Sequence, residues 1–295
     1  MNHQNSLHLQ EPSEHWGGPW TEKKLNAFSK YVDAYLTILQ ANPYWKTIYF
    51  DGFAGNGSRK DPKTFLYNQL QITIEEEEGY KGAAERVVRL EKSFDYYYFV
   101  DNQDSIEKLR EKLTSLPKAE GKELLFMDGD CNLELKKLAT TMRTNKYAAL
   151  VLLDPFGMQI NWNAIAGLKD TRSDIWILLP TGVIVNRLLD KAGELKSIAL
   201  LESFFGLTEE VIRKEFYKTE QKLTLFGEDE ITRKINNPIH HIANMYIQQL
   251  KTVWKYVTDK PLILFNSRNV PIYHFVFASN NAAAKNIAKD IIKRI

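Results

Sequence analysis

The sequence lacks several features that would narrow the choice of function. It contains one cysteine, Cys131, among 295 residues, so no disulfide can form within the chain, as is typical of a reducing cytoplasm. Its six histidines are scattered and give no spacing typical of a zinc site, so no bound metal is expected. Residues 1–14 are polar and no run of about 18 apolar residues occurs, so we expect no signal segment and no membrane contact. These absences predict a cytoplasmic protein.

An excess of charge of one sign is also lacking. The chain has 39 Lys and Arg against 37 Asp and Glu, which gives a net charge of +2. This balance neither demands nor excludes a nucleic-acid partner, and any basic surface must be local. The apolar fraction of 44% and the charged fraction of 26% are those of a globular protein, and the length suits one α/β domain with insertions or two small domains.

What the sequence does contain is an alternation of short apolar runs and amphipathic segments. Strands are expected at 47–50, 96–100, 123–127, 148–153 and 174–179, and helices at 21–40, 82–92, 103–115, 132–143 and 161–168. Thr21 can cap the first of these helices. Such alternation predicts a parallel sheet with right-handed crossovers. Two further strands at 262–265 and 273–278, joined by a short connection, predict an antiparallel edge, and a helix at 281–294 closes the chain.

The expected fold is therefore α/β: a Rossmann-like, doubly wound sheet of seven strands with an antiparallel last strand. A helical insertion at 183–258 precedes the final strand pair, with helices at 186–204, 208–216 and 239–256. Residues 1–20 are expected to form a flexible lead-in. Residues 21–182 and 259–295 then make up the sheet domain.

A glycine-rich loop follows the first strand. The segment 47–57 reads TIYFDGFAGNG, a buried strand that runs into an acid and three glycines. Glycine permits positive φ and the close approach of another molecule, and such a loop is where α/β folds bind nucleotide-like cofactors. The candidate cofactor residues here are Asp51, Gly52, Phe53, Ala54, Gly55 and Gly57. The alternative is an ordinary turn that uses glycine for its geometry.

Acids also follow the next two strands. Asp101 stands where a carboxylate can accept hydrogen bonds from ribose hydroxyls, or where it can cap the helix at 103–115. Asp130 can accept a hydrogen bond from an adenine amino group, or it can cap the helix at 132–143. Because ligands bind outside the carboxyl ends of parallel strands, we expect these acids to line one rim with Asp51.

Asp154, Pro155 and Phe156 follow the fourth strand and are the candidate catalytic residues. A carboxylate and a backbone carbonyl held by proline can accept both hydrogens of an amino group, which turns the nitrogen lone pair toward an electrophile. An aromatic ring beside them can stack on a flat base. The alternative is a strand-to-loop turn with a packed phenylalanine.

The insertion mixes basic and aromatic residues. Phosphate contacts and base stacking are available to Arg187, Lys191, Lys196, Arg213, Lys214, Lys218, Lys222, Arg233 and Lys234, and to Phe204, Phe205, Phe216, Tyr217 and Phe226. Seven interspersed acids dilute this charge: Glu209, Glu210, Glu215, Glu220, Glu228, Asp229 and Glu230. The alternative is a helical cap with solvated charges.

These motifs together resemble a class I methyltransferase that depends on S-adenosylmethionine. The glycine loop resembles its cofactor loop, Asp101 its ribose-binding acid, and residues 154–156 (DPF) the Asp-Pro-Pro-Tyr/Phe signature of amino-group methyltransferases. More closely, the chain resembles the three-Cys-motif partner (TcmP) family over most of residues 21–295. The shared segments are 30–36 (KYVDAYL), 50–55 (FDGFAG), 153–157 (LDPFG), 185–189 (VNRLL) and 273–279 (YHFVFAS).

The resemblance implies a bacterial or phage protein that occurs with a three-cysteine-motif protein and binds S-adenosyl-L-methionine. One departure is that a single proline precedes Phe156 and glycine follows it, so the aromatic residue stands one position early. The function expected is methyl transfer to an amino nitrogen of a nucleic-acid base, in DNA or RNA. The alternative is a non-catalytic, methyltransferase-like module that binds nucleotide or nucleic acid as the partner of a three-cysteine-motif protein.

Overall fold

The structure, a computed structural model, describes residues 19–55, 82–144, 146–188, 195, 197–224, 227–266 and 268–295. Gly57, one of the expected cofactor residues, and Phe226 lie outside them, as do residues 1–18, which were expected to be a flexible lead-in.

A central, mostly parallel sheet organises the molecule. It consists of β1 (Lys46–Asp51), β2 (Tyr96–Asp101), β3 (Glu123–Asp128), β4 (Tyr147–Leu153), β5 (Ser173–Leu179), β8 (Tyr256–Val257), β9 (Leu262–Phe265) and β10 (Pro271–Ser279). The order is β3-β2-β1-β4-β5-β10-β8, and β9 also pairs with β10. Strands β1 to β5 pair in parallel, whereas β10 is antiparallel to β5, β8 and β9. The fold class is thus α/β, as predicted.

The strand count differs from the seven expected. The sheet has eight strands because β8 pairs with Ala278 and Ser279 in a region expected to continue the helix at 239–256. That helix ends earlier, at Leu250. By contrast, β4 behaves as its sequence predicts: it is almost wholly apolar and is buried in the middle of the sheet, between β1 and β5.

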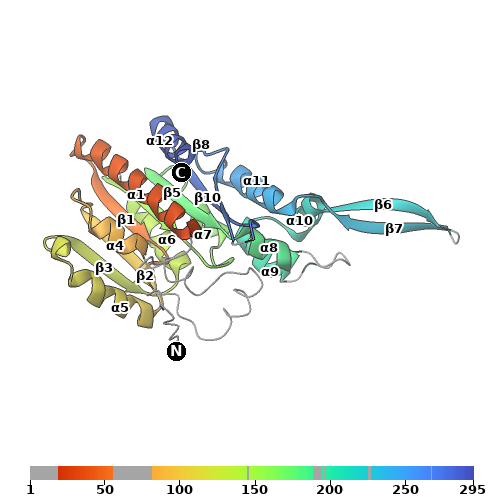
Figure 1. The fold of residues 1–295 in the computed structure, drawn as a ribbon, viewed down its shortest axis with the longest axis horizontal. Coiled ribbons are helices and arrows are strands. Elements are labelled where there is room, and N and C mark those ends of the chain that lie inside the picture. Colours follow the sequence, from red (N-terminus) through yellow and green to blue (C-terminus); the bar gives the residue numbers. More distant parts are fainter. Residues whose placement is uncertain are drawn as a thin grey trace, which may run out of the picture.

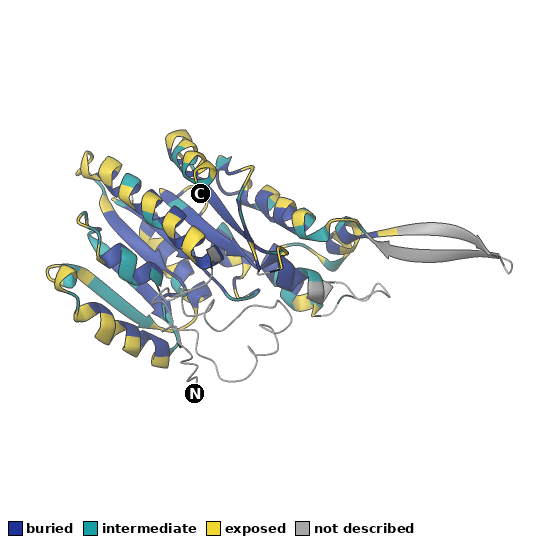
Figure 2. Ribbon diagram, in the orientation of Figure 1, coloured by how far each residue is buried: buried dark blue, intermediate teal, exposed yellow. Residues whose placement is uncertain are grey.

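Helices flank both faces of the sheet (Figures 1 and 2). One face is covered by α1 (Pro19–Gln40), α4 (Gly82–Val88), α5 (Gln103–Thr114) and α12 (Ala282–Lys293). The other is covered by α6 (Cys131–Met142), α7 (Trp162–Ala166), α9 (Ile198–Phe205), α10 (Glu209–Phe216) and α11 (Pro238–Leu250). A short 3-10 helix, η2 (Pro117–Ala119), precedes β3. The buried face of each helix is dark in Figure 2 and its outer face is exposed.

Helix α1 differs from its prediction at its start. It begins at Pro19, so the expected boundary of the lead-in at residue 20 is wrong and Thr21 lies within the helix, where it is fully buried, rather than at its cap. Proline suits the first turn of a helix because its missing N–H has no partner there in any case. The helix therefore carries Trp20 and Thr21 onto the sheet.

The insertion contains a β-hairpin that the sequence reading missed. The expected helix at 186–204 is two helices, α8 (Thr181–Leu188) and α9, and a hairpin of β6 (Tyr217–Thr224) and β7 (Gly227–Lys234) follows α10. This hairpin extends away from the body of the molecule (Figure 1). The expectation of a purely helical insertion is therefore wrong.

Within the described residues, no helix has both the length and the apolar character needed to cross a membrane.

Candidate functional site at the carboxyl ends of the strands

The order of the strands reverses at β1. This strand pairs with β2 on one side and with β4 on the other, so the crossovers on its two sides diverge at its carboxyl end. Asp51 ends β1 and Asp154 follows β4, and each is buried. Ligands of open α/β sheets bind at such a reversal, outside the ends of the strands.

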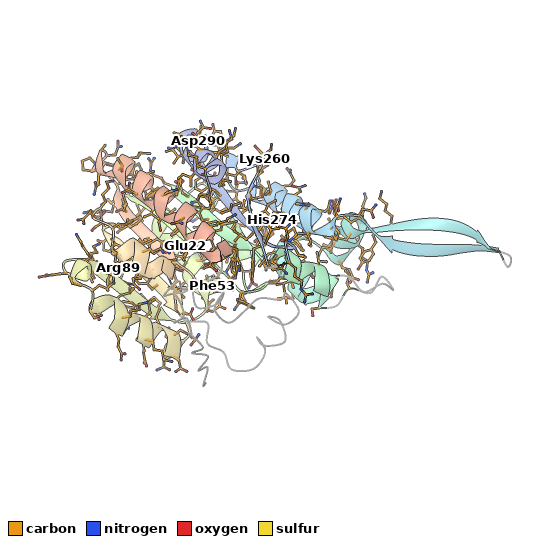
Figure 3. The ribbon with its side chains drawn as sticks, in the orientation of Figure 1. Glu22, Phe53, Arg89, Lys260, His274 and Asp290 are labelled. Carbon is orange, nitrogen blue, oxygen red and sulfur yellow. The ribbon has the colours of Figure 1, made fainter. Side chains whose placement is uncertain are left out.

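The glycine loop is folded back onto the neighbouring strands by backbone hydrogen bonds. The Gly52 N–H donates to Leu152 O at 3.0 Å in β4, and the Ala54 N–H donates to Val100 O at 3.1 Å in β2. The Gly55 N–H donates to the Asp101 carboxylate at 3.2 Å. The loop thus joins the ends of three strands, and Phe53, half-buried at its tip, is labelled in Figure 3.

The two described glycines of the loop are required by packing. Neither has the positive φ that the sequence reading allowed for. A Cβ on Gly52 would lie 2.5 Å from Cys131 Sγ, and one on Gly55 would lie 2.6 Å from Ser105 Cβ in α5. Close approach of α5 and α6, rather than unusual backbone geometry, therefore explains these glycines.

Asp101 is held by the loop and not by the helix that follows it. Its carboxylate accepts from the Gly55 N–H, as above, and from the backbone and side-chain nitrogens of Asn102 at 2.8 and 2.6 Å. Asn102 is the residue that caps α5, through a hydrogen bond from the Ser105 N–H. The alternative that Asp101 caps this helix is therefore wrong.

Asp130 does cap its helix, as one of its two interpretations predicted. Its carboxylate accepts from the backbone N–H groups of Asn132 at 2.8 Å and Leu133 at 3.1 Å, at the start of α6. The residue is exposed. A contact with adenine remains a prediction.

Asp51 is a carboxylate in an apolar setting. Burial raises its pKa to about 7, and the nearby charge of Asp154 adds to this shift. The hydroxyl of Tyr49 donates to it at 2.8 Å and opposes the shift. Within the described residues no cation forms an ion pair with Asp51. The site therefore favours a positively charged ligand beside this carboxylate.

Asp154 is paired with a lysine that the sequence reading did not single out. Lys24 Nζ lies 2.5 Å from Asp154 Oδ2, and the two side chains are only 2% and 4% exposed. Burial lowers the pKa of the Lys24 ammonium, and the charge of Asp154 opposes that change.

The other two candidate catalytic residues follow Asp154. Pro155 is buried beside the ion pair. Phe156 is half-buried and packs against the core on the α1 face, and its N–H donates to Gln159 Oε1 at 3.1 Å.

Aromatic side chains lie beside the ion pair. The ring of Trp20 in α1 stacks on Tyr273 in β10 with centroids 5.5 Å apart, and Lys24 Nζ is 5.7 Å from the Trp20 ring. Burial raises the pKa of Tyr273, and the nearby charge of Asp154 adds to the shift. Because β10 is antiparallel to β5, its first residues reach the same rim as Asp154. The start of α1 therefore covers the side of the rim at β4 and β10; Figure 3 labels Glu22 in this part of the helix.

Four of the five predicted aromatics of the insertion are not available to stack on bases. Phe204 and Phe205 are buried and pack with Tyr246 of α11 in the core, Phe216 is buried against Phe205, and Tyr217 is buried as well. The interpretation of these four as base-stacking residues is wrong, because they anchor the insertion to the sheet.

The sequence contained a feature that could have identified Lys24 as a buried, paired residue. It stands four residues after Trp20 and four before Phe28, so it lies on the apolar face of the predicted helix. A single cation on that face requires a buried partner. Its partner is 130 residues away in the sequence, however, and only the fold identifies it.

Comparison with known proteins adds little. No family model and no curated protein matches the chain. Among solved structures, a crystal structure of a Legionella pneumophila str. Philadelphia 1 protein with the family model DUF519 aligns over 91% of this chain and 99% of that chain, at 14% identity and a TM-score of 0.40. In the described part of the chain, no group of three His, Cys, Asp or Glu side chains is placed to hold a metal ion.

Proposed function

We propose that this chain is an S-adenosylmethionine-dependent methyltransferase that acts on an amino nitrogen of a nucleic-acid base. One observation carries the proposal: two buried carboxylates, Asp51 and Asp154, flank the reversal point of the sheet, where a glycine loop joins the ends of β1, β2 and β4. Asp51, with which no cation of the described residues forms an ion pair, suits a sulfonium, and Asp154 suits an amine.

The proposal includes a Rossmann-like fold and membership of the three-Cys-motif partner family. The order β3-β2-β1-β4-β5 followed by an antiparallel β10 supports the first. The hairpin β6–β7 and the strand β8 are additions to the seven-stranded sheet that we proposed from the sequence.

Each residue of the cofactor side has a role that its contacts support. S-adenosylmethionine supplies, when bound, a methyl group on a positively charged sulfur. Asp51 provides negative charge next to it. Asp101, fixed by the Gly55 N–H, is held in position to accept hydrogen bonds from ribose hydroxyls. Gly52, Phe53 and Ala54 form the backbone between them.

On the acceptor side, Asp154 accepts a hydrogen bond from the amino group and orients its lone pair. A bound cofactor would supply its methyl group to this nitrogen and leave as the neutral thioether, and the nitrogen would lose one proton to the Asp154 carboxylate to which it is hydrogen-bonded. Pro155 fixes the carboxylate, and Phe156 lines the approach. A base within a duplex must flip out to reach this depth.

The ion pair between Lys24 and Asp154 favours a second function. Because Lys24 already holds this carboxylate, the chain can instead be a non-catalytic module that binds nucleotide or nucleic acid with a three-cysteine-motif protein. A cytoplasmic location and partnership with that protein, with DNA or with RNA are proposals in both cases.

Calorimetry with S-adenosylmethionine and S-adenosylhomocysteine tests the cofactor, and transfer of labelled methyl to DNA, RNA and protein tests the reaction. We expect micromolar binding and transfer that Asp154→Asn abolishes. Asp128→Asn, an exposed acid at the end of β3, is the matched control and should retain transfer. If neither compound binds at millimolar concentration, both the proposed methyltransferase activity and the proposed cofactor are wrong. Binding without methyl transfer to any acceptor would favour the second function.

A further inference from the structure

We propose that Asp154 forms a binding site for one primary amine, that Lys24 is its built-in occupant, and that an outside amine enters only when the first turns of α1 withdraw. The identification of that outside amine as the methyl acceptor rests on the proposed function. The site itself does not, because it is defined by the contacts of Lys24.

The geometry of the pair is that of an amine held by a carboxylate. Nζ and Oδ2 are 2.5 Å apart, and neither side chain is accessible to solvent beyond a few per cent. Lys24 presents N–H donors to the same oxygen that an acceptor amine would use. Two amines cannot share this position, so Lys24 must leave before another binds.

The start of α1 covers the site with incomplete polar contacts. Trp20 Nε1 and the Tyr273 hydroxyl are buried and form no hydrogen bond in the described part of the chain. Water would satisfy both if the first turns moved away, which lowers the free energy of opening. Further along α1, the Tyr31 hydroxyl donates to Asp174 at 2.6 Å. The first turns are also held by the Lys24–Asp154 pair and by an ion pair of Glu22 with Arg86 at 2.6 Å, so opening at the N-terminal end must break these contacts while the Tyr31 contact stays.

The size of the site allows a direct test. Lys24→Ala removes Cγ, Cδ, Cε and Nζ, and n-propylammonium replaces these four atoms. We expect n-propylammonium to raise the Tm of this variant saturably, by roughly 2–4 °C. It should leave the native chain and the double variant Lys24→Ala/Asp154→Asn unchanged. Tetramethylammonium, which has no N–H group, and n-propanol, which has no charge, are the matched controls.

Equal effects of n-propylammonium and tetramethylammonium on Lys24→Ala would overturn the amine site. If Lys24→Ala does not fold, hydrogen exchange of the native chain tests the cover instead. We expect the amides of residues 23–26 to exchange at least about tenfold faster than those of 31–36, through local opening. Exchange of both segments at one rate would overturn the opening. Neither measurement uses the cofactor, so failure here and failure of the proposed function are distinguishable.

Discussion

The two sides of the rim are built in different ways. On the cofactor side, the loop after β1 is held by backbone N–H groups that donate to β2, β4 and Asp101. On the acceptor side, Asp154 forms a buried ion pair with a helix that precedes the whole sheet in sequence. The first arrangement depends on several backbone hydrogen bonds and close packing, whereas the second depends on a buried pair of charged side chains. We expect the two sides to respond differently to mutation.

The largest effect should follow from breaking the ion pair. Lys24→Met keeps the apolar stem but leaves Asp154 charged and buried, which typically costs about 3–5 kcal/mol of unfolding free energy. Denaturation by urea, monitored by circular dichroism, measures this loss. Lys92→Met, which removes the exposed pair with Asp33, is the control and should cost roughly 0–1 kcal/mol.

A double variant isolates the pair. Lys24→Met combined with Asp154→Asn removes both charges, so we expect it to be more stable than Lys24→Met alone. If the losses of unfolding free energy of the two single variants simply add in the double variant, the two side chains contribute independently to stability. The contrast between the two sides of the rim would then be wrong.

The next largest effect should come from the glycine loop. Gly55→Ala places a methyl group 2.6 Å from Ser105 Cβ, so the loop or α5 must shift, at a cost of roughly 1–3 kcal/mol. Affinity for S-adenosylmethionine, measured by calorimetry, should fall with it. Gly129→Ala is the matched control, because a Cβ there meets nothing within 4 Å. Unchanged affinity in Gly55→Ala would place the cofactor elsewhere.

These contrasts also explain how much the sequence could predict. Strands β1 to β5, β9 and β10, the acids that end β1 to β3 and the loop at Asp51 are local patterns, and the structure has them where they were expected. The partner of Asp154 was not predicted, because no periodicity links residue 24 to residue 154. The hairpin β6–β7 was missed because its strands do not alternate polar and apolar residues: 218–222 and 228–230 are polar throughout.

A smaller effect should appear in the pH dependence of cofactor binding. The pKa of Asp51, about 7 in the folded protein, lies above its ordinary value of 3.8. A cation binds best to the ionised form, so affinity for S-adenosylmethionine should be highest above pH 7. It should fall about tenfold per pH unit well below it. S-adenosylhomocysteine, whose sulfur is neutral, should show little of this dependence, and Asp51→Asn should remove it. The same slope for both compounds would mean that Asp51 does not face the sulfur.

The smallest effect should separate the two roles of Asp130. Because its carboxylate caps α6, Asp130→Ala should cost about 1 kcal/mol of stability, while Asp130→Ser should retain most of the cap. If Asp130 also accepts a hydrogen bond from adenine, Asp130→Ser should still lose several-fold in affinity for S-adenosylmethionine, because a serine hydroxyl is too short to replace the carboxylate. Equal affinity of the native chain and Asp130→Ser would make this residue a cap only. The cofactor side would then depend on Asp51, the loop and Asp101.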